Sequence, residues 1–176
     1  MRESKVEKKQ KLISVGTGLA VVAIGALVAV RPFNMVNILL IVACVAVGLY
    51  EFNRWHISAD RAIWALLAGI VSVVFALLGI CNLAGVLFAW DIVLYTIPSW
   101  GICYGAIKAL GAFQMYRAGE TNWGWGMLTG VLSVLIGALL ILLPLLGIMT
   151  MTEFTGMLIG VLLLVVGINI SVDAYA

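Results

Sequence analysis

Charged side chains are scarce in this sequence. Of its 176 residues, 10% are charged and 64% are hydrophobic, whereas soluble domains usually carry about 25% charged residues. A water-soluble fold of this length could not bury so much apolar surface, so we expect the bilayer to be its solvent. The formal net charge of +2 comes without a basic patch and therefore indicates no nucleic-acid partner.

Histidine and cysteine, the common metal ligands and nucleophiles, are also few. The one histidine, His56, lies beside Asp60 in a polar connection, which favours an interfacial position. Cys44, Cys81 and Cys103 form no C-x-x-C pair and are interpreted as buried, small hydrophobic side chains. Motifs of hydrolases, zinc proteases, P-loop proteins and dinucleotide-binding folds are lacking as well. The sequence therefore predicts no catalytic residue, no metal ligand, no cofactor and no enzymatic activity.

Six long apolar segments make up most of the chain. They are Leu12–Val30, Met35–Tyr50, Ala62–Cys81, Ile92–Phe113, Trp123–Leu146 and Phe154–Val172. Spanning the hydrocarbon takes about 20 residues, and continuous rather than alternating apolar runs indicate helices instead of barrel strands. We therefore predict an all-α, polytopic bundle of six transmembrane helices over residues 12–176, preceded by a basic cytoplasmic segment, residues 1–11. The first run is too long for a signal-peptide core of about 7–15 residues, so we expect it to be retained.

Lysine and arginine set the expected orientation. With six spans, the connections and ends on one side of the membrane contain eight of the basic residues, and the opposite side contains only Arg31. The eight are Arg2, Lys5, Lys8, Lys9, Lys11, Arg54, Arg61 and Arg117. Both termini are therefore predicted to be cytoplasmic. The six tryptophans are expected near segment ends as an aromatic belt: Trp55, Trp64, Trp90, Trp100, Trp123 and Trp125.

An internal repeat divides the six segments into three tandem hairpins, about 12–54, 61–116 and 123–174. The run Gly18–Gly25 aligns with Gly130–Gly137, and each is followed at the same offset by a proline, Pro32 or Pro144; Gly69–Ala76 is the middle copy. Each second helix has its own late glycine, and all copies run in the same direction. The glycines predicted to pack helices are Gly18, Gly25, Gly48, Gly69, Gly105, Gly130, Gly137 and Gly167. Small residues allow close helix contact within the chain, with homo-oligomer contacts as the alternative. Pro32 and Pro144 are predicted to end their helices at the outer surface.

This pattern resembles the HdeD-like acid-resistance membrane proteins. The similarity lies in three hairpins with a glycine-rich first helix, a following proline, and Gly48-Leu-Tyr-Glu51 in the second helix, over about Val15–Asp173. The resemblance implies a multi-pass protein of the bacterial or archaeal plasma (inner) membrane, of largely undefined activity, with a role in acid or envelope stress. The middle copy departs from the pattern with Lys108 at the position of Glu51, and the third copy with Ile170.

Charges inside a membrane are costly and are therefore the first place to look for function. The repeat places Glu51 and Lys108 at corresponding depths, so they either pair across the bundle or extend separately to the cytoplasmic headgroups. We expect a non-enzymatic membrane protein that has the lipid bilayer as its surroundings and no known small-molecule substrate. One alternative is a small channel or transporter that uses this polar layer, and another is an accessory subunit of a membrane complex.

Overall fold

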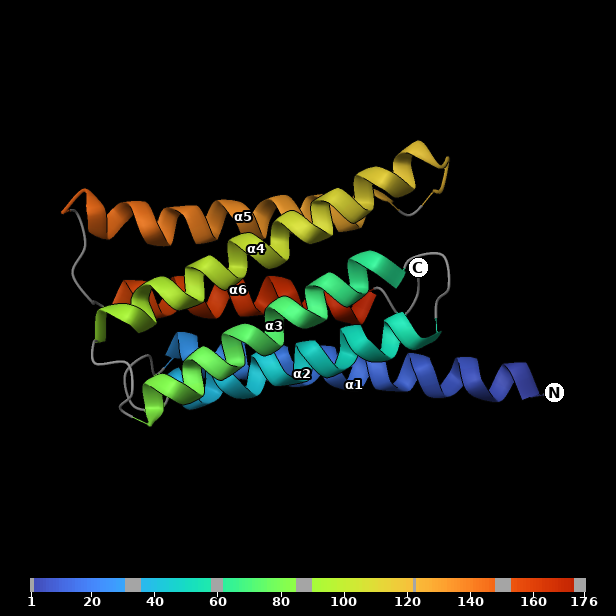
Figure 1. Ribbon diagram of the computed structural model, residues 1–176, viewed down its shortest axis with the longest axis horizontal. Helices are drawn as coiled ribbons and strands as arrows, with labels where there is room; N and C mark the ends of the chain where they lie inside the picture. Colours follow the sequence, from blue (N-terminus) through green and yellow to red (C-terminus); the bar gives the residue numbers. More distant parts are fainter. Residues whose placement is uncertain are drawn as a thin grey trace.

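The computed structural model describes residues 2–30, 36–57, 62–84, 90–121, 123–147 and 153–172. Within these residues the chain forms six α-helices and no strand (Figure 1). The helices are α1 (Arg2–Val30), α2 (Val36–Ile57), α3 (Ala62–Leu83), α4 (Trp90–Arg117), α5 (Trp123–Leu145) and α6 (Glu153–Val172). The prediction of an all-α fold is confirmed.

Four of the described helices are long and apolar enough to cross a membrane. The stretches are Lys11–Ala29, Ile38–Ile57, Ile63–Leu83 and Trp123–Leu143. The apolar stretch described in α6, Gly156–Val172, is shorter. The 28 residues of α4 include Thr96, Pro98 and Lys108, and this helix is less apolar than α2, α3, α5 and α6.

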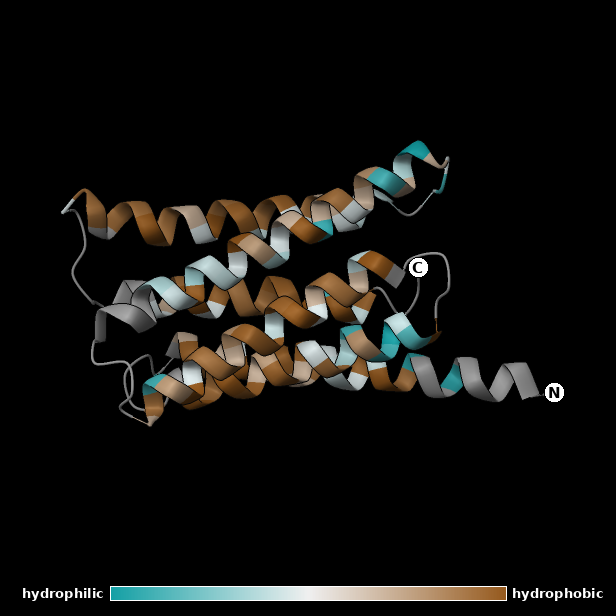
Figure 2. Ribbon diagram, viewed as in Figure 1, coloured by the Kyte–Doolittle hydropathy of each residue, from teal (hydrophilic) through white to brown (hydrophobic). Residues whose placement is uncertain are grey.

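The surface of the bundle is apolar along its length and polar at one end. Large aliphatic side chains such as Leu12, Leu19 and Leu49 are more than half exposed. Figure 2 shows hydrophobic residues along the middle of every helix, with hydrophilic ones gathered at the end where α2 and α4 finish. Both chain termini lie toward this same end (Figure 1). Exposed leucines of this kind are expected of a bundle surrounded by lipid.

The most extensive contacts between helices are those of α2 with α3, α4 with α5, and α6 with α1. Each of these pairs joins two different predicted hairpins. Contacts inside each predicted hairpin, between α1 and α2, α3 and α4, or α5 and α6, are smaller. The last helix thus closes a ring with the first.

The repeat glycines lie at these three extensive interfaces. A methyl group added at Gly105 would lie 2.6 Å from the carbonyl oxygen of Gly130, and one at Gly18 would lie 2.7 Å from that of Gly167. At Gly48 the nearest atom of Gly69, its carbonyl oxygen, would be 3.6 Å away. Because a carbonyl occupies the space of the missing side chain, glycine permits the two backbones to touch. Gly25 likewise faces the Gly160 carbonyl and Gly137 that of Pro98, whereas Gly69 faces the ring of Phe52.

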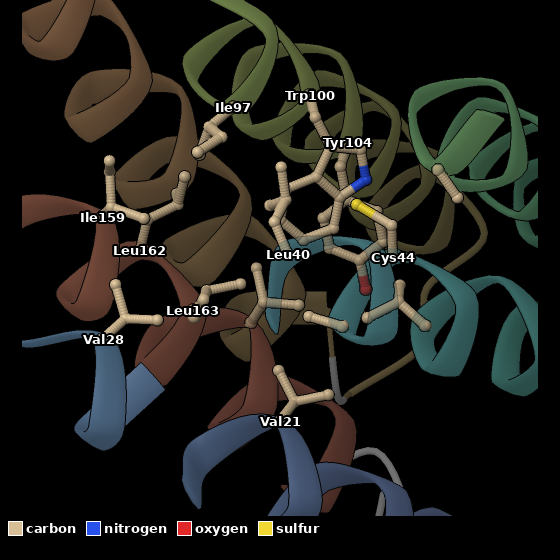
Figure 3. Packing of buried hydrophobic residues seen from close by; sticks show 14 of the residues in the cluster. Val21, Val28, Leu40, Cys44, Ile97, Trp100, Tyr104, Ile159, Leu162 and Leu163 are labelled. Carbon is tan, nitrogen blue, oxygen red and sulfur yellow. The ribbon is translucent and has the colours of Figure 1, made fainter. Parts of the chain in front are cut away.

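The centre of the ring is filled by equivalent positions of α2, α4 and α6. Counted from Gly48, Gly105 and Gly167, these positions form three layers: Leu40, Ile97 and Ile159; Ala43, Trp100 and Leu162; and Val47, Tyr104 and Val166. Each of these side chains is at most 5% exposed and belongs to one hydrophobic cluster. Figure 3 shows members of these layers from each helix, including Leu40 of α2, Trp100 of α4 and Leu162 of α6, together with Val21 and Val28 of α1.

Several details differ from the sequence prediction. Trp100 is completely buried in the middle of α4, so its placement in an aromatic belt was wrong. Cys103 is exposed rather than buried. Helix α2 continues past Tyr50 to Ile57, and α1 already begins at Arg2, so the basic head is part of its helix.

The two prolines predicted to end helices have different outcomes. Helix α5 ends at Leu145, directly after Pro144, and the chain then turns at Gly147 with φ of 67°. Proline cannot donate to the helical ladder, so its place in the last turn fits that ending. Pro32 lies outside the described residues.

Candidate functional site

Glu51 is a completely buried carboxylate at the inner face of α2. It lies one turn beyond Val47, which is also completely buried, so the two share one helical face. A carboxylate without solvent contact requires compensation by opposite charge or hydrogen bonds, because an isolated charge is costly to bury. The neighbouring helix α4 provides both.

Lys108 of α4 forms an ion pair with Glu51. Its Nζ lies 2.8 Å from Glu51 Oε1, and the lysine side chain is only 10% exposed. Tyr104, one turn earlier on α4, donates its hydroxyl proton to the same oxygen at 3.1 Å. The Lys108 ammonium also lies 5.6 Å from the centroid of the Tyr104 ring, within the range of a cation–π contact. The structure thus brings together the two charged residues that the sequence singled out, and adds Tyr104.

The second carboxylate oxygen of Glu51 has weaker interactions than the first. Its Oε2 is buried and accepts no hydrogen bond from the described residues. Arg54, one turn further along α2, places its Nη1 3.9 Å from this oxygen. Two cations therefore accompany one carboxylate near the polar end of the bundle.

A second polar contact continues from this pair toward the middle of the bundle. The Trp100 ring stacks on Tyr104, with centroids 5.6 Å apart and planes inclined by 25°. Its indole N–H donates to the hydroxyl of Ser72 on α3 at 3.2 Å. Trp100, Tyr104 and Lys108 are spaced four residues apart, so one face of α4 carries all of these groups.

The third copy of the repeat contributes no charge to this layer. At the position of Glu51 and Lys108, α6 has Ile170, which is completely buried. The neighbouring Asn169 is 2% exposed, and its Oδ1 accepts no hydrogen bond from the described residues. The polar layer is therefore an asymmetric feature of a nearly threefold core, and it ties α2 to α4.

The chemistry available here is that of a buried charge pair. The layers of Val47, Ala43 and Leu40 and their equivalents separate the pair from the other end of the bundle with aliphatic and aromatic side chains. Among the described residues no group of three or more His, Cys, Asp or Glu side chains could hold a metal ion.

Tyr104 was not predicted as part of this site, and Trp100 was predicted at the membrane interface instead of in the core. The signal that could have found them is the spacing of Trp100, Tyr104 and Lys108, which puts two aromatic rings with polar atoms on the same helical face as the intramembrane lysine. Ser72 bonds across helices by accepting a hydrogen bond from Trp100. Thr129 instead donates to the carbonyl of Trp125 in its own helix.

Replacing Tyr104 by phenylalanine should lower the free energy of unfolding by about 1.5–3 kcal/mol, because it removes a hydrogen bond to a buried carboxylate. The measurement is equilibrium unfolding in mixed detergent micelles. Tyr95→Phe on the same helix is the control, since Tyr95 is 40% exposed and its replacement should be nearly neutral. Equal effects of the two substitutions would contradict the role given to the hydroxyl.

Comparison of the chain with protein-family models, with curated proteins and with solved structures finds no match. The resemblance to the HdeD-like proteins therefore remains a prediction.

Proposed function

We propose that this chain is a multi-pass protein of the bacterial or archaeal plasma membrane, with six spanning helices and both termini in the cytoplasm. Four candidate spans and the antiparallel course of six helices support it. So do Arg54 near the end of α2 and Arg117 at the end of α4, which lie at the hydrophilic end where the termini also lie (Figure 2). A basic end of this kind marks the cytoplasmic side of a membrane protein.

The proposed role is that of a non-enzymatic, HdeD-like protein in acid or envelope stress tolerance. The observation that supports a non-enzymatic role best is the burial of the charge pair: Glu51 is 0% exposed and is held by Lys108 and Tyr104. A charge satisfied inside a packed core holds helices together. The link to stress comes from the sequence resemblance.

A deletion strain tests the physiological part of this proposal. We expect it to survive acid, osmotic and detergent challenge less well than its parent, and a plasmid copy of the gene to restore survival. A mutant indistinguishable from its parent under all three challenges would speak against the stress role.

A channel or transporter is the second candidate, because Ser72, Trp100, Tyr104, Glu51 and Lys108 form a run of polar groups into the bundle. The apolar layers beyond Tyr104 favour the non-conducting proposal. Proteoliposomes with the wild-type chain should then pass protons and alkali cations no faster than empty vesicles. A flux abolished by Glu51→Ala and Lys108→Ala would establish the channel instead.

A further inference from the structure

The first turns of α1 extend beyond the helices around them. The described part of α6, the main partner of α1, ends at Val172, and Ser171 already lies against Gly18. Residues 2–11 of α1 therefore continue past the end of α6, and Figure 1 shows this stretch reaching further than the neighbouring helices. The candidate span of α1 begins at Lys11, so under the membrane arrangement proposed above the residues before it lie at the cytoplasmic surface.

This stretch concentrates the positive charge of the chain. Residues 2–11 contain five basic and two acidic residues, whereas the rest of the chain contains five basic and six acidic residues. Along the sequence, Glu3 and Glu7 interrupt the basic residues, so no patch of one sign is apparent. The helix separates the two signs, because it brings residues three and four positions apart to the same face.

The helical register places the basic residues on the face of α1 that turns away from the bundle. Exposed residues of this face recur in steps of four and three: Leu12, Gly16, Leu19 and Ala23. Counted back from Leu12 in the same steps, the face continues through Lys9, Lys5 and Arg2. Lys8, one turn before Leu12, is itself exposed. We call these four basic positions the basic face of α1.

The acidic residues continue the opposite face of the helix. The buried positions of α1 recur in the same steps: Ser14, Gly18, Val21 and Gly25. Counted back from Ser14, this face continues through Lys11 and Glu7, and Glu3 lies one turn before Glu7. The register therefore puts no carboxylate of residues 2–11 on the basic face.

The basic face begins at the depth of the lipid headgroups. A helix rises about 1.5 Å per residue, so Lys8 and Lys9 lie about 3–5 Å beyond Lys11. The headgroup layer of one leaflet is about 5–7 Å thick, and both positions fall within it. Lys5 lies about 9 Å beyond Lys11, still within one Debye length, about 8 Å, of the charged surface.

We propose, given the membrane arrangement above, that the basic face of α1 binds the headgroups of anionic phospholipids in the cytoplasmic leaflet. Basic residues directly beside a membrane helix attract such lipids, and each one near the surface strengthens the attraction by about fivefold. The register favours a lipid as the partner, because the charges continue the same face of α1 whose exposed residues lie among the lipid chains. An acidic protein in the cytoplasm would require no such register.

Quenching of a fluorophore beside this face by labelled lipids tests the proposal. In a background without the three native cysteines, Leu12→Cys carries the fluorophore, since Leu12 is 74% exposed and lies one turn from Lys8. The vesicles contain either phosphatidylglycerol or phosphatidylcholine with the same spin label near the headgroup. We expect phosphatidylglycerol to quench several-fold more strongly, and about 1 M salt, where the Debye length is about 3 Å, to remove most of the difference. Equal quenching by the two lipids would overturn the proposal.

A permuted segment is the matched variant. Ser4→Lys with Lys5→Ser, and Lys9→Gln with Gln10→Lys, move two charges by one residue each. Composition and net charge stay the same and the depth changes little, yet each charge turns by about 100° and leaves the basic face. The excess quenching by phosphatidylglycerol should fall at least fivefold, whereas Lys5→Arg with Lys9→Arg should retain it. An unchanged excess in the permuted chain would show that the amount of charge attracts the lipid and not the face, and would contradict the proposal.

A second reporter separates this proposal from the membrane arrangement on which it depends. Leu83→Cys places the fluorophore at the end of α3, where Leu83 is 57% exposed and the helix has no charged residue. Both lipids should quench it equally, and a phosphatidylglycerol excess as large as at position 12 would overturn the proposal. Quenching of both reporters by phosphatidylcholine would support the membrane arrangement even if position 12 showed no preference. No quenching at either position would contradict that arrangement and this proposal together.

Discussion

Replacing Lys108 by methionine should destabilise the bundle more than any other single change of a polar side chain among those described. Methionine keeps the length of the side chain and removes its charge, so the buried Glu51 retains the Tyr104 hydroxyl at 3.1 Å and loses its closest cation, while the Arg54 guanidinium lies 3.9 Å away. Removing one partner of a buried ion pair costs about 3–5 kcal/mol, because the other charge is left without compensation. The change should appear as a loss of that size in the free energy of unfolding in mixed detergent micelles.

Two double variants distinguish the effect of losing the ion pair from the effect of leaving one charge without its partner. Glu51→Leu combined with Lys108→Met removes both charges. The free energy of unfolding of this variant should be close to that of the wild type, because apolar replacement of a buried pair is often neutral or stabilising. Glu51→Lys combined with Lys108→Glu restores opposite charges and should recover much of the loss. If Lys108→Met and the double apolar variant lost equal stability, the pair would not be the cause.

Much of the fold could be predicted from hydrophobic run length and glycine spacing. The all-α class and the approximate positions of the six helices follow from apolar segments of membrane length. The end of α2 did not, since a polar Glu51-Phe-Asn-Arg54 segment predicts a helix terminus near Tyr50. The helix continues to Ile57 because polar residues such as Glu51 and Arg54 are compatible with a helix, and hydropathy shows where an apolar run ends rather than where a helix ends.

The repeat predicted which residues are equivalent, but not which helices pack. Equal glycine positions predict that each hairpin is a copy of the others, and in the structure these glycines face the adjacent predicted hairpin rather than their own partner helix. A glycine presents no side chain whose chemistry would name its neighbour. The predicted repeat is therefore a hairpin of two consecutive helices, whereas the helices that pack most extensively on each other come from two different predicted hairpins.

The candidate site was predictable in its charges and not in its aromatic part. Glu51 and Lys108 stood out because charges are rare within apolar segments. Trp100 was assigned to the interface because tryptophan is common there. Its burial depends on the hydroxyl of Ser72, which satisfies the indole N–H inside the core. A buried tryptophan needs such a partner, and that partner is a property of the assembled bundle.

The second large effect is expected at the interface that closes the ring. Gly18→Leu places a side chain where the Gly167 carbonyl oxygen and the Ser171 backbone nitrogen would each lie 2.7 Å from its Cβ. Both atoms belong to the backbone of α6, so they cannot move aside without displacing the helix. Overpacking of this kind costs about 1–3 kcal/mol or more, and here we expect the upper end of that range, with α6 separated from α1.

Gly16→Leu, two residues earlier on the same helix, is the matched control. No atom outside its own helix lies within 4 Å of a methyl group added there. Both substitutions gain the same helix propensity, about 0.5–1 kcal/mol relative to glycine, so the difference between their free energies of unfolding measures the interface alone. Gly105→Leu should match Gly18→Leu, because the distances at its interface are equally short, whereas Gly48→Leu should cost less, since its nearest neighbour is a Val73 methyl group at 3.3 Å. Four equal losses would mean that the substitutions act through the helix and not through the ring.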